Sequence, residues 1–143
     1  MTEWEKLQAG LIYNGFDREL FDRRVAAKKL FRAYNRTEDG ETALRQELLA
    51  KLFRSLGRNV WIEPDFRCEF GRNIAIGDNT YINFGCVILD CAAVTIGDGA
   101  IVGTGSVVTK DIPAGVVALG NPCRVVRKIT ESDKWGFPGP ENL

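Results

Sequence analysis

The chain has 143 residues, the length of one domain. Its 19 Lys and Arg residues balance 19 Asp and Glu residues, and a chain without net charge is a poor candidate for general binding to nucleic acid or anionic membranes. It contains no histidine, which excludes His-ligated metals, Ser-His and Cys-His nucleophile pairs and the commonest general base in enzymes.

The signals for cellular location favour the cytoplasm. The sequence has no apolar run long enough to span a bilayer, and its first six residues lack the features of a signal peptide. Its four cysteines show no C-x-x-C spacing, and in a reducing compartment they are expected to be buried thiols: Cys68, Cys86, Cys91 and Cys123. We therefore expect a cytoplasmic protein that binds neither metal, nucleic acid nor membrane.

Residues 1–58 have the apolar spacing of helices, and three helices are predicted there. A short amphipathic turn lies around Trp4, Leu7 and Leu11. The second helix has its apolar face at Phe21, Val25, Ala26, Leu30, Phe31 and Tyr34. The third follows Thr42 as N-cap, ends before Gly57, and has its apolar face at Leu44, Leu48, Leu49, Leu52, Phe53 and Leu56. The Lys and Arg residues of this segment are expected to form solvated faces.

From about residue 59 the apolar period changes to six residues, and the residue after each repeated aliphatic is often small. The units are Phe70-Gly71, Ile76-Gly77, Ile82-Asn83, Ile88-Leu89 and, after a two-residue slip at Val94-Thr95, Ile96-Gly97, Val102-Gly103, Val108-Thr109 and a weaker Ala114-Gly115. A period of six is typical of a hexapeptide β-helix, in which the aliphatic points inward and the small residue fits a crowded corner. The alternative is an ordinary small sheet with Gly-rich turns, but two phased blocks of units favour the β-helix.

Eight units at three per turn predict fewer than three coils, close to the minimum for stability. We therefore expect the helices to cap one end of the coil and self-association to bury more of its surface.

Both halves of the chain resemble the maltose and galactoside O-acetyltransferases. The N-terminal motifs are Lys6-Leu7-Gln8-Ala9-Gly10-Leu11-Ile12-Tyr13, Asp17-Arg18-Glu19-Leu20 and Arg32-Ala33-Tyr34-Asn35. The later ones are Trp61-Ile62-Glu63-Pro64, Gly71-Arg72-Asn73-Ile74, Ile82-Asn83-Phe84, Leu89-Asp90, residues 103–113 and residues 120–127. The resemblance implies a mainly β fold: a short left-handed parallel β-helix (59–129) after an N-terminal α-helical module (1–58), with a C-terminal tail (130–143).

The resemblance also implies a homotrimer that transfers an acetyl group from acetyl-CoA to a sugar hydroxyl of maltose, glucose or a galactoside. Family members continue from a Val-Thr-Ile-Gly-Asp segment, here residues 94–98, through further coils that carry a histidine acting as general base. This chain has one such segment, which joins the two blocks directly, and no histidine. Two hypotheses follow: an O-acetyltransferase with another base, or an inactive remnant that binds CoA or is purely structural.

Family position suggests the residues of the transfer site. Asn83 matches the active-site asparagine beside the acceptor, although an asparagine at a coil corner also satisfies backbone groups. Asp90 and Glu69 lie near the same region and are candidate bases, but an ordinary carboxylate pKa near 4 is too low to deprotonate an alcohol efficiently. Cys91 is a weaker candidate, because no base is present to activate its thiol.

The CoA side of the site is better preserved in the sequence. Thr109, Lys110, Arg124 and Arg127 match positions that contact the CoA nucleotide, and Gly103 and Thr104 match the pantetheine track. A solvated basic tail is the alternative for the arginines.

For the acceptor, an acidic residue of the galactoside enzymes aligns with Gly15, near Asp17. Asp17 is thus a candidate for sugar binding, with Glu69, or else the N-cap of the following helix.

Overall fold

The computed structural model describes residues 1–134, and this part of the chain begins with three helices. They are α1 (Glu3–Gln8), α2 (Arg18–Asn35) and α3 (Thr42–Leu52). Short strands follow: β1 (Ser55–Leu56), β2 (Trp61–Ile62), β3 (Phe66–Cys68), β4 (Ile74–Ile76), β5 (Tyr81–Ile82), β6 (Cys86–Ile88), β7 (Val94–Ile96), β8 (Ile101–Val102), β9 (Val107–Val108), β10 (Val116–Leu119) and β11 (Arg124–Lys128). A single 3-10 turn, η1 (Glu131–Lys134), ends the described residues.

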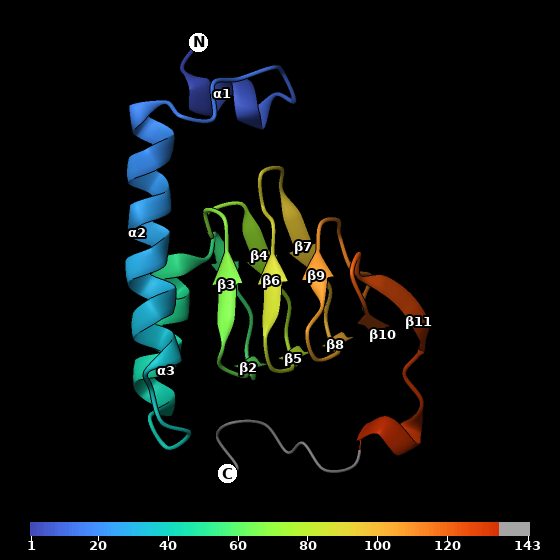
Figure 1. Cartoon of the computed structure of the whole chain (residues 1–143). Coiled ribbons are helices and arrows are strands. Elements are labelled where there is room, and N and C mark those ends of the chain that lie inside the picture. The colour runs from blue at the N-terminus through green and yellow to red at the C-terminus, as the bar shows by residue number, and fades with distance from the viewer. Residues whose placement is uncertain (135–143) are drawn as a thin grey trace.

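The strands form three parallel sheets that the chain visits in turn. The first sheet has the order β1-β4-β7, the second β2-β5-β8-β10 and the third β3-β6-β9, while β11 adds to β10 in the antiparallel sense. Residues 20 positions apart pair along a sheet, as Leu56 does with Ile76 and Ile76 with Ile96. Such a winding is a parallel β-helix, and the predicted fold class is confirmed (Figure 1).

The sheets contain three complete coils and the start of a fourth at Ile112, more than the unit count predicted. The additional coil is the first one, where Leu56, Ile62 and Cys68 keep the six-residue spacing. Its pattern was missed because glutamates follow Ile62 and Cys68, where later coils mostly have small residues.

The predicted inward positions form most of the core. Their side chains are at most 2% exposed and include Ile76, Ile82, Ile88, Ile96, Val102 and Val108. Two predicted units are wrong. Ala114 is exposed, because Ile112 and Val116 fill the core of the last coil. Phe70 is buried outside the coil, against Leu7 and Leu20 of the helices.

The turns between sheets stack into three corners. The first corner joins the first and second sheets (57–60, 77–80 and 97–100), the second joins the second and third (63–65, 83–85 and 103–106), and the third leads back to the first sheet (69–73, 89–93 and 109–111). Crowding explains the glycines at the first corner. A Cβ on Gly57 would lie 2.5 Å from the backbone nitrogen of Asp78, and one on Gly77 would lie 2.7 Å from that of Asp98.

The helices cap the first coil, as expected. Ala27, Phe31 and Tyr34 of α2 and Leu49 and Leu52 of α3 belong to the same buried cluster as the coil. In Figure 1, α2 runs along the end of the coil marked by β2 and β3, and β11 lies at the opposite end.

Several details of the predicted helices are wrong. The N-cap of α3 is Glu41 and not Thr42, and the helix ends at Leu52, because Phe53 turns extended toward β1. Phe21 and Ala26 are exposed, whereas Leu20 and Ala27 take the buried positions of α2.

Within the described residues, no helix combines the length and the apolar composition needed to cross a membrane. All four cysteines are free thiols.

Candidate functional site

The candidate residues gather on the two corners that flank the third sheet. Asn83, Gly103 and Thr104 lie on the second corner, and Glu69, Asp90, Thr109 and Lys110 lie on the third. The two groups lie at opposite ends of the short strands β3, β6 and β9.

Asn83 is half-buried and held by its own turn. Its backbone nitrogen donates to the carbonyl of Val102 at 2.9 Å, and its Oδ1 accepts from the backbone nitrogen of Phe84 at 2.8 Å. The side-chain nitrogen of Asn83 donates to no other residue in the described part of the chain, so it is the part of the amide that remains for a ligand. Asn83 therefore has both a corner-forming role and a free donor.

Gly103 stacks directly above Asn83 on the second corner. A Cβ at Gly103 would lie 2.8 Å from the Cβ of Leu119, so the close approach of the next coil requires glycine. Thr104 beside it is exposed. The second corner thus places Gly103 and the exposed Thr104 next to Asn83.

The carboxylate of Asp90 is completely buried at the third corner. Its Oδ1 accepts from the backbone nitrogens of Glu69 (3.0 Å) and Phe70 (2.9 Å), and its Oδ2 accepts from that of Asn73 (3.3 Å). The side chain of Asn73 returns a bond to the Asp90 carbonyl at 2.8 Å. Burial raises the pKa of Asp90, while these backbone donors act to lower it. This geometry favours a role in closing the turn of residues 69–73.

Glu69 points into a small polar cluster between this corner and the helices. Its Oε1 accepts from Arg24 Nε at 2.6 Å, and Arg24 also donates to the carbonyl of Gly15 at 2.7 Å. Both side chains of the pair are about one quarter exposed, at 24% and 27%. The Arg24 guanidinium also lies over the ring of Phe70. The pair therefore ties α2 to the third corner and occupies the Glu69 carboxylate.

Cys91 lies near the Arg24–Glu69 pair, and it packs with Tyr13 against the buried cluster of Leu7, Leu20 and Phe70. Burial first, and then the neighbouring carboxylates of Glu69 and Asp90, raises the pKa of the Cys91 thiol. A raised pKa keeps the sulfur in its unreactive thiol form, which argues against a nucleophilic role.

Asp17 is the N-cap of α2. Its Oδ2 accepts from the backbone nitrogen of Glu19 at 2.9 Å, which satisfies one of the donors left free at the start of a helix. One of the two predicted roles of Asp17 is thereby present in the structure.

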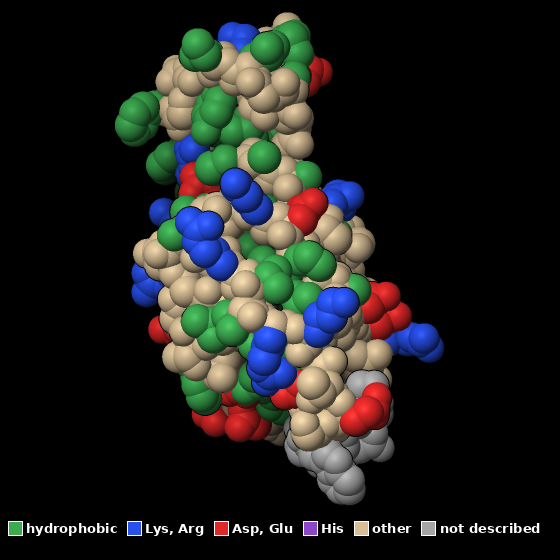
Figure 2. Space-filling view, turned by 90° about the vertical axis from the view of Figure 1, so that its right-hand side faces the viewer, with side chains coloured by type: hydrophobic (Ala, Val, Ile, Leu, Met, Phe, Trp, Pro, Cys, Tyr) green, Lys and Arg blue, Asp and Glu red, His purple; other side chains and the backbone are tan. Residues whose placement is uncertain are grey.

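The side chains predicted to contact the CoA nucleotide are exposed but divided between two places in the fold. Thr109 and Lys110 follow β9, whereas Arg124 and Arg127 belong to β11, every residue of which is exposed. Figure 2 looks at the end of the molecule that carries β11 and shows basic side chains interspersed with apolar ones. Arg127 is already engaged: both of its terminal nitrogens lie 2.7 Å from the Asp133 carboxylate, and this contact raises the pKa of the guanidinium.

The sequence analysis missed Arg24 and Tyr13, which complete the cluster around Glu69. Nothing in the sequence distinguishes Arg24 from the solvated basic residues around it. Only the packing of α2 against the third corner does so. Among residues 1–134, no group of three or more Cys, Asp or Glu side chains is arranged to hold a metal ion.

Comparisons with known proteins agree with this architecture. The family model of the maltose acetyltransferase hexapeptide capping motif matches residues 6–57. A galactoside O-acetyltransferase of Escherichia coli (strain K12) is 29% identical over 188 aligned positions, which cover 94% of this chain and 93% of the relative.

Solved structures are similar as well. A maltose O-acetyltransferase from Clostridium difficile 630 shares 32% identity over 92% of this chain and 99% of that chain, with a TM-score of 0.68. A hexapeptide-repeat acetyltransferase from Vibrio cholerae O1 biovar eltor, complexed with acetyl coenzyme A, shares 26% identity over 92% and 100%, with a TM-score of 0.63.

The alignment with the E. coli relative runs over 188 positions, whereas this chain has 143 residues, so at least 45 positions have no counterpart here. Nevertheless β7 pairs in register with β4, and the coil passes through residues 94–98 without a break. The coil of this chain is therefore shortened relative to its relatives, which the chain otherwise matches over nearly their whole length. The chain belongs to the hexapeptide-repeat acetyltransferases that include the maltose and galactoside O-acetyltransferases.

Proposed function

We propose that this chain binds acetyl-CoA and a sugar acceptor, as its relatives' names suggest, without measurable transfer of the acetyl group. The observation that carries the proposal is the state of its two candidate bases. The buried carboxylate of Asp90 accepts hydrogen bonds from three backbone nitrogens, and Glu69 is paired with Arg24 at 2.6 Å. A positioned general base contributes roughly 10²–10⁴ in rate, and the chain has no histidine to supply it.

The residues present suit the co-substrate, acetyl-CoA. Gly103 and the exposed Thr104 lie on the same corner as Asn83, which offers a side-chain donor. Lys110 and Arg124 are exposed and suited to phosphate groups. Arg127 would have to leave Asp133 in order to contact a phosphate. When bound, acetyl-CoA supplies the activated acetyl group, and these side chains hold and orient it.

The acceptor is proposed to be a hydroxyl of maltose, glucose or a galactoside, bound beside Asn83 on the second corner. Asn83 would orient the hydroxyl through its side-chain nitrogen. We further propose a cytoplasmic homotrimer with its sites between subunits. Four free thiols are consistent with a reducing compartment.

A second candidate function is a slow but true acetyl transfer with Glu69 as base. It is favoured by the 27% exposure of the Glu69 side chain, which lies at the protein surface and not in the sealed turn. A sugar that displaced Arg24 would free this carboxylate.

Calorimetric titration with CoA and acetyl-CoA-dependent thiol release separate these functions. With maltose, glucose and a galactoside as acceptors, we expect CoA binding without thiol release above the uncatalysed background. The positive control is a version of this chain with the relatives' missing coils restored between its two blocks. Thiol release by the unmodified chain, lost in Glu69→Gln, would establish the second function instead.

Matched charge variants test the CoA contacts. Lys110→Gln and Arg124→Gln are each expected to weaken CoA binding about tenfold, because each removes a charge-assisted bond. Lys28→Gln, on the exposed face of α2, removes the same charge away from the site and should leave affinity unchanged. Equal affinity in all three variants would show that Lys110 and Arg124 do not contact CoA, and absence of CoA binding would leave only a structural role.

A further inference from the structure

The last described turn of the chain folds back onto strand β11. Directly after β11, the backbone nitrogen of Ile129 donates to the carbonyl of Gly115 at 2.9 Å, which holds this part of the chain against the last coil. The 3-10 turn η1 follows, and the backbone nitrogen of Asp133 donates to the carbonyl of Thr130 at 3.1 Å. In Figure 1 this turn is the red helical ribbon below β11. The turn brings Asp133 back to Arg127, six residues earlier in the sequence.

The carboxylate of Asp133 contacts the Arg127 guanidinium through two hydrogen bonds. Arg127 Nη1 donates to Asp133 Oδ2 and Arg127 Nη2 donates to Oδ1, each at 2.7 Å. Oδ2 also accepts from the backbone nitrogen of Thr130 at 2.7 Å and from its hydroxyl at 3.1 Å. The guanidinium and the Thr130 nitrogen hold the pKa of Asp133 well below its usual range, so the carboxylate is charged at neutral pH. Such a bidentate contact is stronger than an ordinary surface ion pair.

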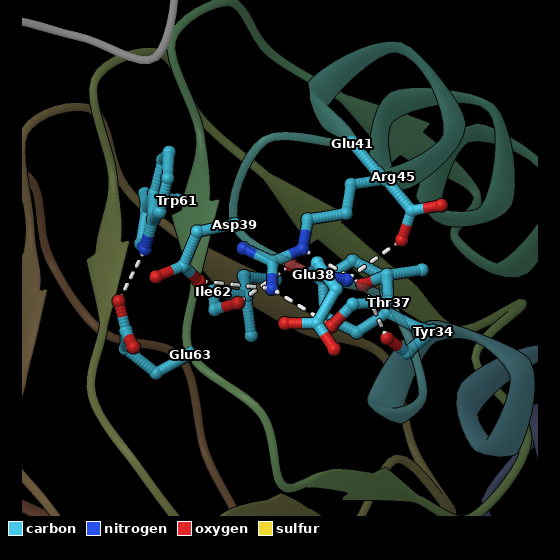
Figure 3. Close-up of polar contacts among 9 residues, drawn as sticks. All are labelled: Tyr34, Thr37, Glu38, Asp39, Glu41, Arg45, Trp61, Ile62 and Glu63. Atoms are coloured by element: carbon cyan, nitrogen blue, oxygen red, sulfur yellow. Dashed lines mark hydrogen bonds and ion pairs between the residues drawn. The ribbon is translucent and has the colours of Figure 1, made fainter. Parts of the chain in front are cut away.

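Another Arg–Asp pair of the molecule lies in a different setting. Arg45 of α3 donates through Nη2 to Asp39 Oδ1 at 3.1 Å and through Nε to Thr37 Oγ1 at 2.8 Å, contacts that are drawn in Figure 3. The Arg45 side chain is 7% exposed, whereas that of Arg127 is 50% exposed. The Arg45 contacts therefore serve the fold, but a ligand from solvent can reach Arg127.

The charges near Arg127 are divided between the strand and the turn. Strand β11 has three basic residues and no acidic one. The acidic residues that follow it in the described part of the chain, Glu131 and Asp133, both belong to η1. A carboxylate and a phosphate each offer arginine a pair of oxygens for the same bidentate geometry. Asp133 therefore occupies the two guanidinium nitrogens that a phosphate would use.

We propose that residues 130–133 form an acidic clasp that competes with CoA for Arg127. Until CoA binds, the Asp133 carboxylate holds the guanidinium, and on binding Arg127 exchanges this carboxylate for a phosphate. A phosphate group carries more negative charge than a carboxylate, so it can take the place of Asp133, whereas an uncharged ligand cannot. The clasp lowers the affinity for CoA by the cost of breaking the Arg127–Asp133 contact. This inference rests on the proposed CoA binding and adds to it a device that regulates the same site.

Calorimetric titration of the full chain with CoA, at a salt concentration of about 0.15 M to screen distant charges, tests the clasp. Asp133→Asn keeps the size of the side chain and removes its charge, and it should bind CoA about threefold to tenfold more tightly than the wild type does. Asp22→Asn is the matched control, because Asp22 pairs with Arg18 on α2 at 3.0 Å and should not affect CoA. Damage to the fold would not increase affinity, so a gain reports on the clasp.

The double variant Arg127→Gln/Asp133→Asn shows whether Asp133 acts through Arg127. No clasp can form without the guanidinium, so in the Arg127→Gln background Asp133→Asn should change the CoA affinity by less than about twofold. An equal gain in both backgrounds would mean that Asp133 merely repels phosphates, and the clasp would be wrong. Equal affinity of the wild type and Asp133→Asn would also overturn the clasp but leave the proposed function intact. If neither of these two proteins binds CoA, the proposed function fails, and the clasp fails with it.

Discussion

The carboxylate of Asp90 serves the fold through the backbone groups that it satisfies. Asp90→Asn replaces one acceptor oxygen by an NH₂ group that faces the nitrogens of Glu69, Phe70 or Asn73. We expect a loss of about 1–3 kcal/mol in the free energy of unfolding, measured by urea denaturation. Asp65→Asn, at an exposed position, should change it by less than about 0.5 kcal/mol. Equal stability of the two variants would contradict the structural role.

The pH dependence of this loss follows from the raised pKa of Asp90. Between the unfolded value near 4 and the higher folded value, the folded chain binds more protons at Asp90 than the unfolded chain does. The contribution of Asp90 is therefore complete at low pH and declines as the pH rises through the folded pKa. Asparagine does not titrate, so the stability gap between the wild type and Asp90→Asn should narrow as the pH rises from about 4 through the folded pKa of Asp90. A gap that widens would mean that the backbone donors, and not burial, determine the pKa.

Asp17 is the N-cap of helix α2, and variants at this position separate its capping role from its predicted role in sugar binding. Asp17→Ala should reduce the free energy of unfolding by about 1 kcal/mol, because the backbone nitrogen of Glu19 loses its acceptor. Asp17→Ser retains a capping oxygen and should remain close to the wild type in urea denaturation. Asp22→Ala, which removes only the exposed pair with Arg18, should cost less than about 0.5 kcal/mol. If Asp17→Ser is stable but binds a galactoside more weakly, Asp17 also contacts the sugar.

The first corner depends on glycines at its points of closest approach. Gly77→Ala would place a methyl group 2.7 Å from the backbone nitrogen of Asp98 and against its carboxylate. We expect a loss of about 1–3 kcal/mol or more in thermal or urea unfolding, since the next coil must move away. Gly40→Ala is the matched control, because its Cβ would meet nothing within 4 Å. A stable Gly77→Ala variant would show that the coils can separate at this corner without cost.

Glycines such as Gly77 are also the reason why the coil was predictable. The six-residue period is visible in the sequence wherever backbone crowding requires a small residue after a buried aliphatic residue, as after Ile76 and Ile96. The six-residue pattern no longer predicts the buried positions where a corner differs in length or is covered by the helices. Phe70 follows the six-residue count but packs on the helices, and Ala114 follows it at the shortened last coil.

At the scale of the whole molecule, the candidate residues could be predicted from the sequence, but their hydrogen bonds and ion pairs could not. Family position suggested Glu69 and Asp90, yet the partner of Glu69 is Arg24, 45 residues away, and the donors to Asp90 are backbone groups. Such contacts cannot be predicted from residue types and their spacing in the sequence. The same holds for Arg45, whose sequence context is that of an exposed helical arginine.

Assembly is the remaining prediction at this scale. The described chain leaves large apolar side chains exposed at several places, among them Ile12 and Phe16 (98% and 97%) and Val125 and Val126 of β11 (50% and 56%). Such surfaces are typical of interfaces, and the family resemblance implies a trimer. We expect a mass of about 48 kDa by sedimentation equilibrium, three times the 15.9 kDa chain. Phe16→Ser or Val126→Ser should favour the monomer, whereas Lys28→Gln, at an exposed position of α2 away from the site, should not. A wild-type mass of 15.9 kDa would contradict the trimer and, with it, a transfer site between subunits.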